Sequence, residues 1–101
     1  MNKTIRFYLA QADRNGLPVS NDKLDYIRSK LALITGGFSE FPIKGYWMNA
    51  NNNLIIEDTS LLESFTSDNK IEEIRQLASE YKFTCDQESV LLTIDGAAEF
   101  L

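Results

Sequence analysis

The sequence predicts an α+β fold of the ferredoxin-like kind, in which two helices cover one face of a largely antiparallel sheet. Segments of alternating hydrophobicity and segments of helical periodicity follow one another in the order β-α-β-β-α-β, which is the order of the split βαβ arrangement. The chain has 101 residues, of which 44% are hydrophobic and 25% charged. That size and composition suit one core, so we expect a single domain over 1–101.

The first strand and the first helix have the clearest patterns. Residues 4–10 alternate, with Ile5, Phe7 and Leu9 on one face, which predicts a strand with one buried side. Ser20, Asn21 or Asp22 is expected to cap the helix that follows. Its buried positions recur at helical spacing: Leu24, Ile27, Leu31 and Ile34. Gly36-Gly37 then ends the helix, because glycine tolerates the left-handed conformation that a helix end requires.

The middle of the chain predicts a hairpin. Residues 38–48 are rich in aromatic side chains but interrupted by Pro42 and Gly45, which favours an edge strand or a bulged ribbon. The asparagine-rich segment 49–53 is a turn, and residues 54–57 return as the second arm. A further strand is expected over 59–66. The phase of its apolar residues shifts, which predicts a bulge or break near Asp58 and leaves open whether Leu61 or Leu62 faces the core.

A second helix and a terminal hairpin complete the fold. Ser67, Asp68 or Asn69 is expected to cap the helix, with Glu72 completing a capping box. Its buried stripe is Ile71, Ile74, Leu77, Ala78 and Tyr81. Residues 90–94 alternate as a last long strand. Asp95-Gly96 is a two-residue turn signal that would fold 97–101 back as a short edge strand.

Composition excludes several functions. The net charge is −5, from 15 acidic and 10 basic residues, which opposes binding to nucleic acid or to an anionic membrane and suits a basic protein partner. The chain start alternates rather than forming an apolar run, and no stretch approaches the length of a membrane span. We therefore expect a cytoplasmic protein that contacts neither nucleic acid nor membrane.

The side chains that usually perform catalysis are scarce. The chain has no histidine and a single cysteine, Cys85, which is expected to be a small buried residue and not a nucleophile. Four carboxylates on or beside strands are the remaining candidates for acid–base work: Glu57, Glu63, Glu88 and Glu99. Their spacing brings no two of them together, so they are interpreted as surface carboxylates. We expect no catalytic residue, no metal and no cofactor.

Short pieces of the sequence resemble a family of small bacterial and phage-associated domains of unknown function. The matching pieces are Gly36-Gly37-Phe38, Gly45-Tyr46-Trp47, Leu54-Ile55-Ile56-Glu57 and Gln87-Glu88-Ser89-Val90-Leu91, the Gln-Glu-Ser-Val piece being the most specific. Some members of that family are lipoproteins, whereas this chain starts with neither a signal peptide nor a lipidation cysteine. The resemblance implies an intact domain and no known chemistry.

Three groups of residues are candidates for binding. The aromatic segment offers Phe41, Tyr46 and Trp47, because aromatic side chains are enriched at binding hot spots; Trp47 also suits a small core beneath the hairpin. Tyr26 and Leu33 lie roughly opposite the buried stripe of the first helix and form an exposed apolar pair. Arg6 and Tyr8 lie on the sheet face that the helices leave uncovered.

These features favour a non-catalytic protein-interaction module, such as a phage or mobile-element accessory protein that inhibits a basic host protein. The alternative is a small-ligand-binding or catalytic dimer of the α+β-barrel type, a homodimer formed through the open sheet face. A deep pocket on that face would favour the alternative, whereas a flat acidic or aromatic patch would favour the protein partner.

Overall fold

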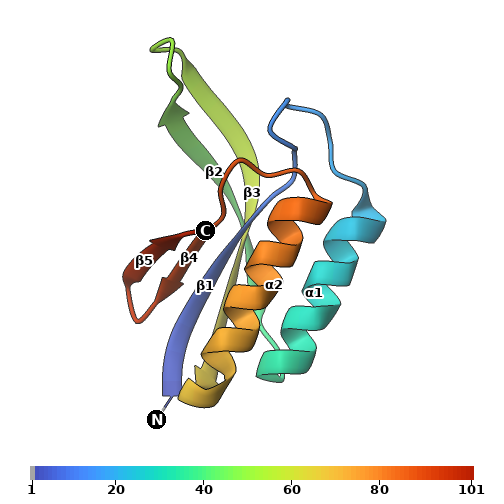
Figure 1. Ribbon diagram of the computed structural model, residues 1–101, viewed down its shortest axis with the longest axis vertical. Helices are drawn as coiled ribbons and strands as arrows, with labels where there is room; N and C mark the ends of the chain where they lie inside the picture. The colour runs from blue at the N-terminus through green and yellow to red at the C-terminus, as the bar shows by residue number, and fades with distance from the viewer. Residues whose placement is uncertain (1) are drawn as a thin grey trace.

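The computed structural model describes residues 2–101 and has an α+β fold with two helices on one face of a sheet (Figure 1). The elements in chain order are β1 (Asn2–Ala10), α1 (Asn21–Thr35), β2 (Ser39–Met48), β3 (Leu54–Ser67), a 3-10 turn (Asp68–Lys70), α2 (Ile71–Thr84), β4 (Leu91–Ile94) and β5 (Ala97–Phe100). The sheet order is β2-β3-β1-β4-β5, and every neighbouring pair is antiparallel. The predicted fold class is confirmed.

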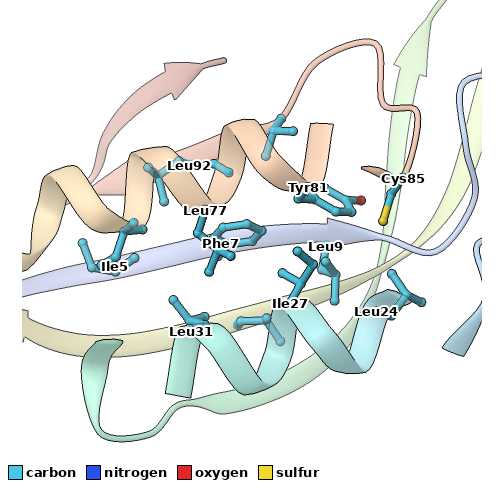
Figure 2. Packing of buried hydrophobic residues seen from close by; sticks show 14 of the residues in the cluster. Ile5, Phe7, Leu9, Leu24, Ile27, Leu31, Leu77, Tyr81, Cys85 and Leu92 are labelled. Carbon is cyan, nitrogen blue, oxygen red and sulfur yellow. The ribbon is translucent and has the colours of Figure 1, made fainter. Parts of the chain in front are cut away.

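The core lies between the sheet and the two helices (Figure 2). The central strand β1 contributes Ile5, Phe7 and Leu9, which are fully buried, as its alternation predicts. The rings of Phe7 and Tyr81 have their centroids 5.9 Å apart at a tilt of 56°, an arrangement that aromatic pairs favour. The buried stripe of α2 is the predicted one: Ile71, Ile74, Leu77, Ala78 and Tyr81.

Helix α1 begins and ends where the sequence predicts. The hydroxyl of Ser20 accepts a hydrogen bond from the backbone nitrogen of Lys23 at 3.4 Å. At the other end Gly36 has a φ of 90°, and its N–H donates to the carbonyl oxygen of Ala32 at 2.8 Å. The left-handed glycine predicted at this end is confirmed.

The capping box predicted for α2 is absent. The chain is already helical in the 3-10 turn, so Lys70 occupies the N-cap position with φ −100° and ψ −9° and makes no side-chain cap. The amide oxygen of Asn69 instead accepts a hydrogen bond from the hydroxyl of Ser67 at 2.5 Å, which takes up the acceptor that a cap would have used.

The break predicted near Asp58 is also wrong, because β3 runs without interruption through fourteen residues. Its register with β2 is regular from Leu54 to Glu63, and its register with β1 is regular from Thr59 to Ser67. The open choice between the two leucines is settled: Leu62 is fully buried in the core, and Leu61 lies on the opposite face. The alternation of apolar residues is lost only because, on the N-terminal side of Asp58, both faces of the strand carry apolar side chains.

The hairpin formed by β2 and β3 extends well past the helices. We call residues 44–58 the arm, since β1 ends level with Thr59 and the last backbone bond to it joins the Gln11 nitrogen to the Asp58 oxygen at 3.1 Å. Figure 1 shows the arm projecting beyond the ends of α1 and α2. At its tip the side chain of Asn49 accepts hydrogen bonds from two backbone nitrogens, of Asn51 at 2.9 Å and of Asn53 at 3.0 Å, which confirms the predicted asparagine turn.

A polar chain of hydrogen bonds ties α1 to the sheet on the helix side. Arg28 holds both carboxylate oxygens of Glu40, at 2.8 and 3.0 Å. The same carboxylate accepts from the hydroxyl of Ser60 at 2.9 Å, and that hydroxyl accepts from the side-chain amide of Gln11 at 3.1 Å. The Arg28 guanidinium is the main reason that the pKa of Glu40 lies below its usual value. Among residues 2–101, no helix is long and apolar enough to cross a membrane.

The Glu40–Arg28 pair predicts a pH-dependent loss of stability. A carboxylate whose pKa is depressed in the folded state stabilises the protein above its unfolded-state pKa, and that contribution is lost as the pH falls through the folded-state pKa. We expect Glu40→Gln to lower the free energy of unfolding at pH 7 by about 0.5–1 kcal/mol, allowing for solvent screening of this partly exposed pair. Urea unfolding from pH 7 to pH 3 should show the difference shrinking as the pH falls. A pH-independent difference would contradict it.

Gly36 predicts a cost for any side chain at the end of α1. We expect Gly36→Ala to lower the free energy of unfolding by about 1 kcal/mol, because alanine is strained at a positive φ although no atom lies within 4 Å of its Cβ. Gly45→Ala is the matched control, since Gly45 has no positive φ and its Cβ would meet only the Thr59 hydroxyl oxygen, at 3.9 Å. Equal losses in urea unfolding would show that conformation is not the cause.

Candidate ligand-binding groove

A large groove lies where the arm leaves the body of the sheet. Its volume is about 1400 Å³, larger than the roughly 300–1,000 Å³ typical of small-molecule sites. The floor is formed by Tyr8 and Ala10 of β1 and by Thr59 of β3. The arm forms one wall, and the segments 11–18 and 87–89, with Leu91 and Phe100, form the other. A smaller hollow of about 330 Å³ lies between the two helices and is mostly polar at its rim.

The two loops beside the groove are fastened to each other. The Nε of Arg14 lies 2.9 Å from a carboxylate oxygen of Asp86, and its guanidinium also donates to the carbonyl oxygen of Gln87 at 3.2 Å. The buried side chain of Gln87 donates in return to the carbonyl oxygen of Ala12 at 2.8 Å. Asp13 shapes its own loop by accepting from the backbone nitrogens of Asn15 and Leu17 at 2.8 and 3.0 Å. These bonds hold the two loops together, so this wall of the groove has a defined shape.

The floor of the groove is anchored from below. The hydroxyl of Tyr81, on α2, donates to the carbonyl oxygen of Ala10 at 2.7 Å. Burial of this hydroxyl, more than any neighbouring charge, raises the pKa of Tyr81 well above its usual value. Tyr81 therefore stays neutral and keeps the end of β1 in place beneath the groove.

The arm contributes a hydrogen-bonded pair, Trp47 and Glu57. Gly45 lies directly across the β2–β3 ladder from Glu57, and Trp47 is the diagonal neighbour on the same face. Because Gly45 has no side chain, the carboxylate is free to lie against the indole, whose Nε1 donates to a Glu57 oxygen at 3.0 Å. The result is an aromatic face and an oriented carboxylate side by side.

The groove is negatively charged overall. Four acidic and two basic side chains line it: Asp13, Glu57, Asp58, Glu88, Arg14 and Lys44. Both bases are already used, since Arg14 pairs with Asp86 and Lys44 pairs with Asp58 at 3.0 Å. Among the residues that the structure describes, no lysine or arginine lies within salt-bridge distance of Glu57 or Glu88. A ligand with a positive centre is therefore favoured here.

The structure brings some of the predicted binding residues together and separates the rest. Tyr8, Tyr46 and Trp47 line the groove. Phe41 lies elsewhere on the open face of β2, and Arg6 is paired with Glu63 at 3.0 Å on the same face, away from the groove. Tyr26 and Leu33 are 45% and 80% exposed, which confirms their predicted exposure. Both lie beside α2 and outside the groove: the Tyr26 hydroxyl donates to a Glu80 carboxylate oxygen at 2.6 Å, and Leu33 lines the smaller hollow between the helices.

The four carboxylates on or beside strands fall into two pairs, one inside the groove and one outside it. Glu57 and Glu88 both line the groove, which their spacing in the sequence did not predict. Glu63 is held by Arg6, and Glu99 by the Arg75 guanidinium at 2.9 and 2.7 Å, which lowers the pKa of Glu99. These last two are surface ion pairs, as interpreted from the sequence.

Two loop segments that line the groove were not among the binding residues predicted from the sequence. The first, 12–16, carries Asp13, Asn15 and Gly16, which indicated a turn but no function. The second, 87–89, is part of the Gln-Glu-Ser-Val piece that carries the family resemblance. A piece of sequence that carries a family resemblance and lies in a loop is the signal that could have found this wall, although Gln87 and Val90 within it are also buried.

Comparison with known proteins shows a likeness in fold to a solved structure. No family model and no curated protein matches the chain. Among solved structures, the chain is similar to a phage SAM lyase in complex with S-methyl-5'-thioadenosine. The TM-score is 0.70 at 14% sequence identity, and the alignment covers 99% of this chain and 87% of that chain.

The likeness to a phage protein agrees with the phage association of the suspected family, but no family model supports that family itself. It also corrects the expected function. The leading expectation was a non-catalytic protein-interaction module, and the fold is instead shared with an enzyme solved with a small adenosine-derived ligand. With a large groove present as well, small-ligand binding or catalysis, the alternative weighed from the sequence, fits better than a protein partner.

Proposed function

We propose that the groove binds an adenosine-derived sulfonium or thioether, S-adenosylmethionine or S-methyl-5'-thioadenosine, and that the protein cleaves the sulfonium to the thioether. The observation that carries this proposal is the coincidence of two features. The fold is similar along its whole length to that of a phage SAM lyase holding S-methyl-5'-thioadenosine. The large groove at the base of the arm pairs an aromatic ring with an oriented carboxylate.

The aromatic side chains suit the adenine part of such a ligand. Trp47 and Tyr8 line the groove from the same face of the sheet, and stacking of a base on an aromatic ring contributes roughly 1–3 kcal/mol. The polar backbone and side chains of segment 87–89 lie on the opposite wall, where ribose hydroxyls or the amino-acid part of a ligand would find partners. An adenosyl group thus has both an apolar surface and a polar surface to contact.

The carboxylates suit the positive sulfur. A sulfonium carries a positive charge but no hydrogen to donate, so it is recognised by aromatic faces and by nearby negative charge. Glu57 is held against Trp47 at 3.0 Å and so presents both features at one point. A thioether has no charge and gains little from the carboxylate, which separates the two ligands energetically.

The absence of histidine does not argue against this reaction. When a carbon–sulfur bond of a sulfonium breaks, the electron pair stays on sulfur, which leaves as a neutral thioether without needing a proton. The four-carbon fragment is completed either by attack of its own carboxylate or by loss of a proton to a base. The protein's part is to hold the reacting conformation and exclude water, and Glu57 and Glu88 are the groove carboxylates available as a base.

The proposal predicts that removing one charge affects the cationic ligand most. By calorimetric titration at pH 7 we expect Glu57→Gln to weaken S-adenosylmethionine binding about 5–30-fold, the loss of one charge-assisted contact. Binding of S-methyl-5'-thioadenosine should change much less. Formation of the thioether from S-adenosylmethionine, followed by chromatography, should fall in the same variant.

Glu63→Gln is the control for that experiment, because Glu63 lies on the same face of the same strand and outside the groove. It should leave both affinities unchanged. Failure of wild-type protein to bind either compound at millimolar concentration would overturn the proposal, and binding without turnover would restrict the function to ligand binding.

Trp47, the single tryptophan, predicts an optical signal. Adding S-methyl-5'-thioadenosine should change its fluorescence in a saturable way, because the indole lies in the groove. Trp47→Ala should weaken binding about tenfold, whereas Phe41→Ala should not, since Phe41 lies on the same strand and face but outside the groove. An unchanged spectrum at saturating ligand would place the ligand elsewhere.

A further inference from the structure

The arm carries apolar side chains that the chain itself leaves uncovered. On the face that continues the helix side of the sheet, Tyr46 pairs across the ladder with Ile56, and Met48 pairs with Leu54. We call these four residues the arm patch. They are 60%, 55%, 62% and 56% exposed, in that order. Figure 1 shows why: both helices end before the arm begins.

The other face of the arm is apolar as well. Trp47 and Ile55 pair across it, with Ile43 nearer the body, so the arm is a two-stranded ribbon with apolar residues on both sides. An isolated two-stranded ribbon is marginally stable in water, and it gains stability only by packing a hydrophobic face against another element. Neighbouring exposed apolar side chains of this kind are typical of interaction sites.

The charge distribution indicates what covers the patch. Residues 45–56 contain no charged side chain, although the whole chain has a net charge of −5. Two acidic chains repel each other over most of their surfaces, and a long uncharged segment is where that repulsion is weakest. A basic protein would be met by acidic residues, and an anionic membrane by basic ones; the arm offers neither. A second copy of this chain has the matching surface, uncharged and apolar.

We infer that the arm is a self-association element, on which a second copy of this chain packs through the arm patch. Isologous packing of one patch on its own copy buries the same residues on both sides, as two sheet faces pack at a spacing of about 10 Å. The patch alone is small compared with the roughly 800 Å² per partner of a standard interface, so the association is concentration-dependent.

Self-association also affects the groove. Tyr46 and Ile56 belong both to the arm patch and to the groove lining. Both residues lie on the face of the arm opposite Trp47 and Glu57, so a second copy on the patch covers only the helix-side part of the groove. This step rests on the proposed function, whereas the association itself does not.

Sedimentation equilibrium of the full chain tests the association. We expect the wild-type mass to rise from one chain to at least two between about 1 and several hundred µM, the range of small interfaces. The double variant Met48→Ser/Leu54→Ser, which changes arm-patch residues outside the groove lining, should remain a single chain over that range. Its fold is checked by circular dichroism.

The matched control is Leu33→Ser/Phe83→Ser, which removes two side chains on the helices that are 80% and 83% exposed. This control should associate like wild type. A wild-type protein that stays a single chain at the highest concentration overturns the inference, and so does an assembly that survives the arm variant.

Wild-type protein alone gives a second test if the arm variant fails to fold. Association of the native state raises the melting temperature with protein concentration, so the midpoint should increase by several degrees over a hundredfold range. A concentration-independent midpoint contradicts the inference. Titrations of S-methyl-5'-thioadenosine at low and high protein concentration then separate the two proposals. Equal affinity at the two concentrations would show that association does not affect the groove. No binding at either concentration would contradict the proposed function and leave the association untouched.

Discussion

The difference in length between β3 and the two helices is the constraint on which the rest of the structure depends. Fourteen strand residues extend about 45 Å at the usual rise, whereas α1 and α2, with fifteen and fourteen residues, extend only about 20 Å. The helices can therefore cover only half of the strand. The covered half becomes the core, and the uncovered half becomes the arm.

The groove is a direct consequence of that mismatch. Where β1 ends, β3 continues with β2 as its remaining neighbour, and the loops that enter α1 and leave α2 come together beside the arm. Bonds such as Arg14 to Asp86 and Tyr81 to Ala10 hold this junction. A ligand site arises at the junction because residues from separate segments of the chain meet there while no helix fills the space.

The groove contains few groups that could act in catalysis, and the proposed reaction requires few. A sulfonium already contains a good leaving group, so an enzyme that acts on it needs neither a histidine nor a nucleophile of its own. Orientation, removal of water and a placed negative charge are sufficient contributions in principle. An acidic groove with aromatic walls supplies the placed negative charge directly. A second copy on the arm patch would cover the helix-side part of the groove, on the face of the arm opposite Trp47 and Glu57.

The sequence by itself determined the α+β fold, the buried stripes of both helices, the end of α1 at Gly36 and the asparagine turn at the tip of the arm. Each of these depends on local periodicity or on the backbone freedom of one residue, which are properties of neighbouring positions. It predicted wrongly a break at Asp58, because a strand that leaves its core loses the alternation that marks the inner face.

Only the tertiary structure decided the site. Tyr8, Trp47, Glu57 and segment 87–89 are far apart along the chain and meet because β3 pairs with β1 on one side and β2 on the other. Glu57 and Glu63 look alike in the sequence, as strand carboxylates on one face. One is held by an arginine and the other lies in a groove without a cation, because Arg6 is opposite Glu63 whereas Gly45 is opposite Glu57. That difference arises from strand register, a long-range property that no short stretch of sequence contains.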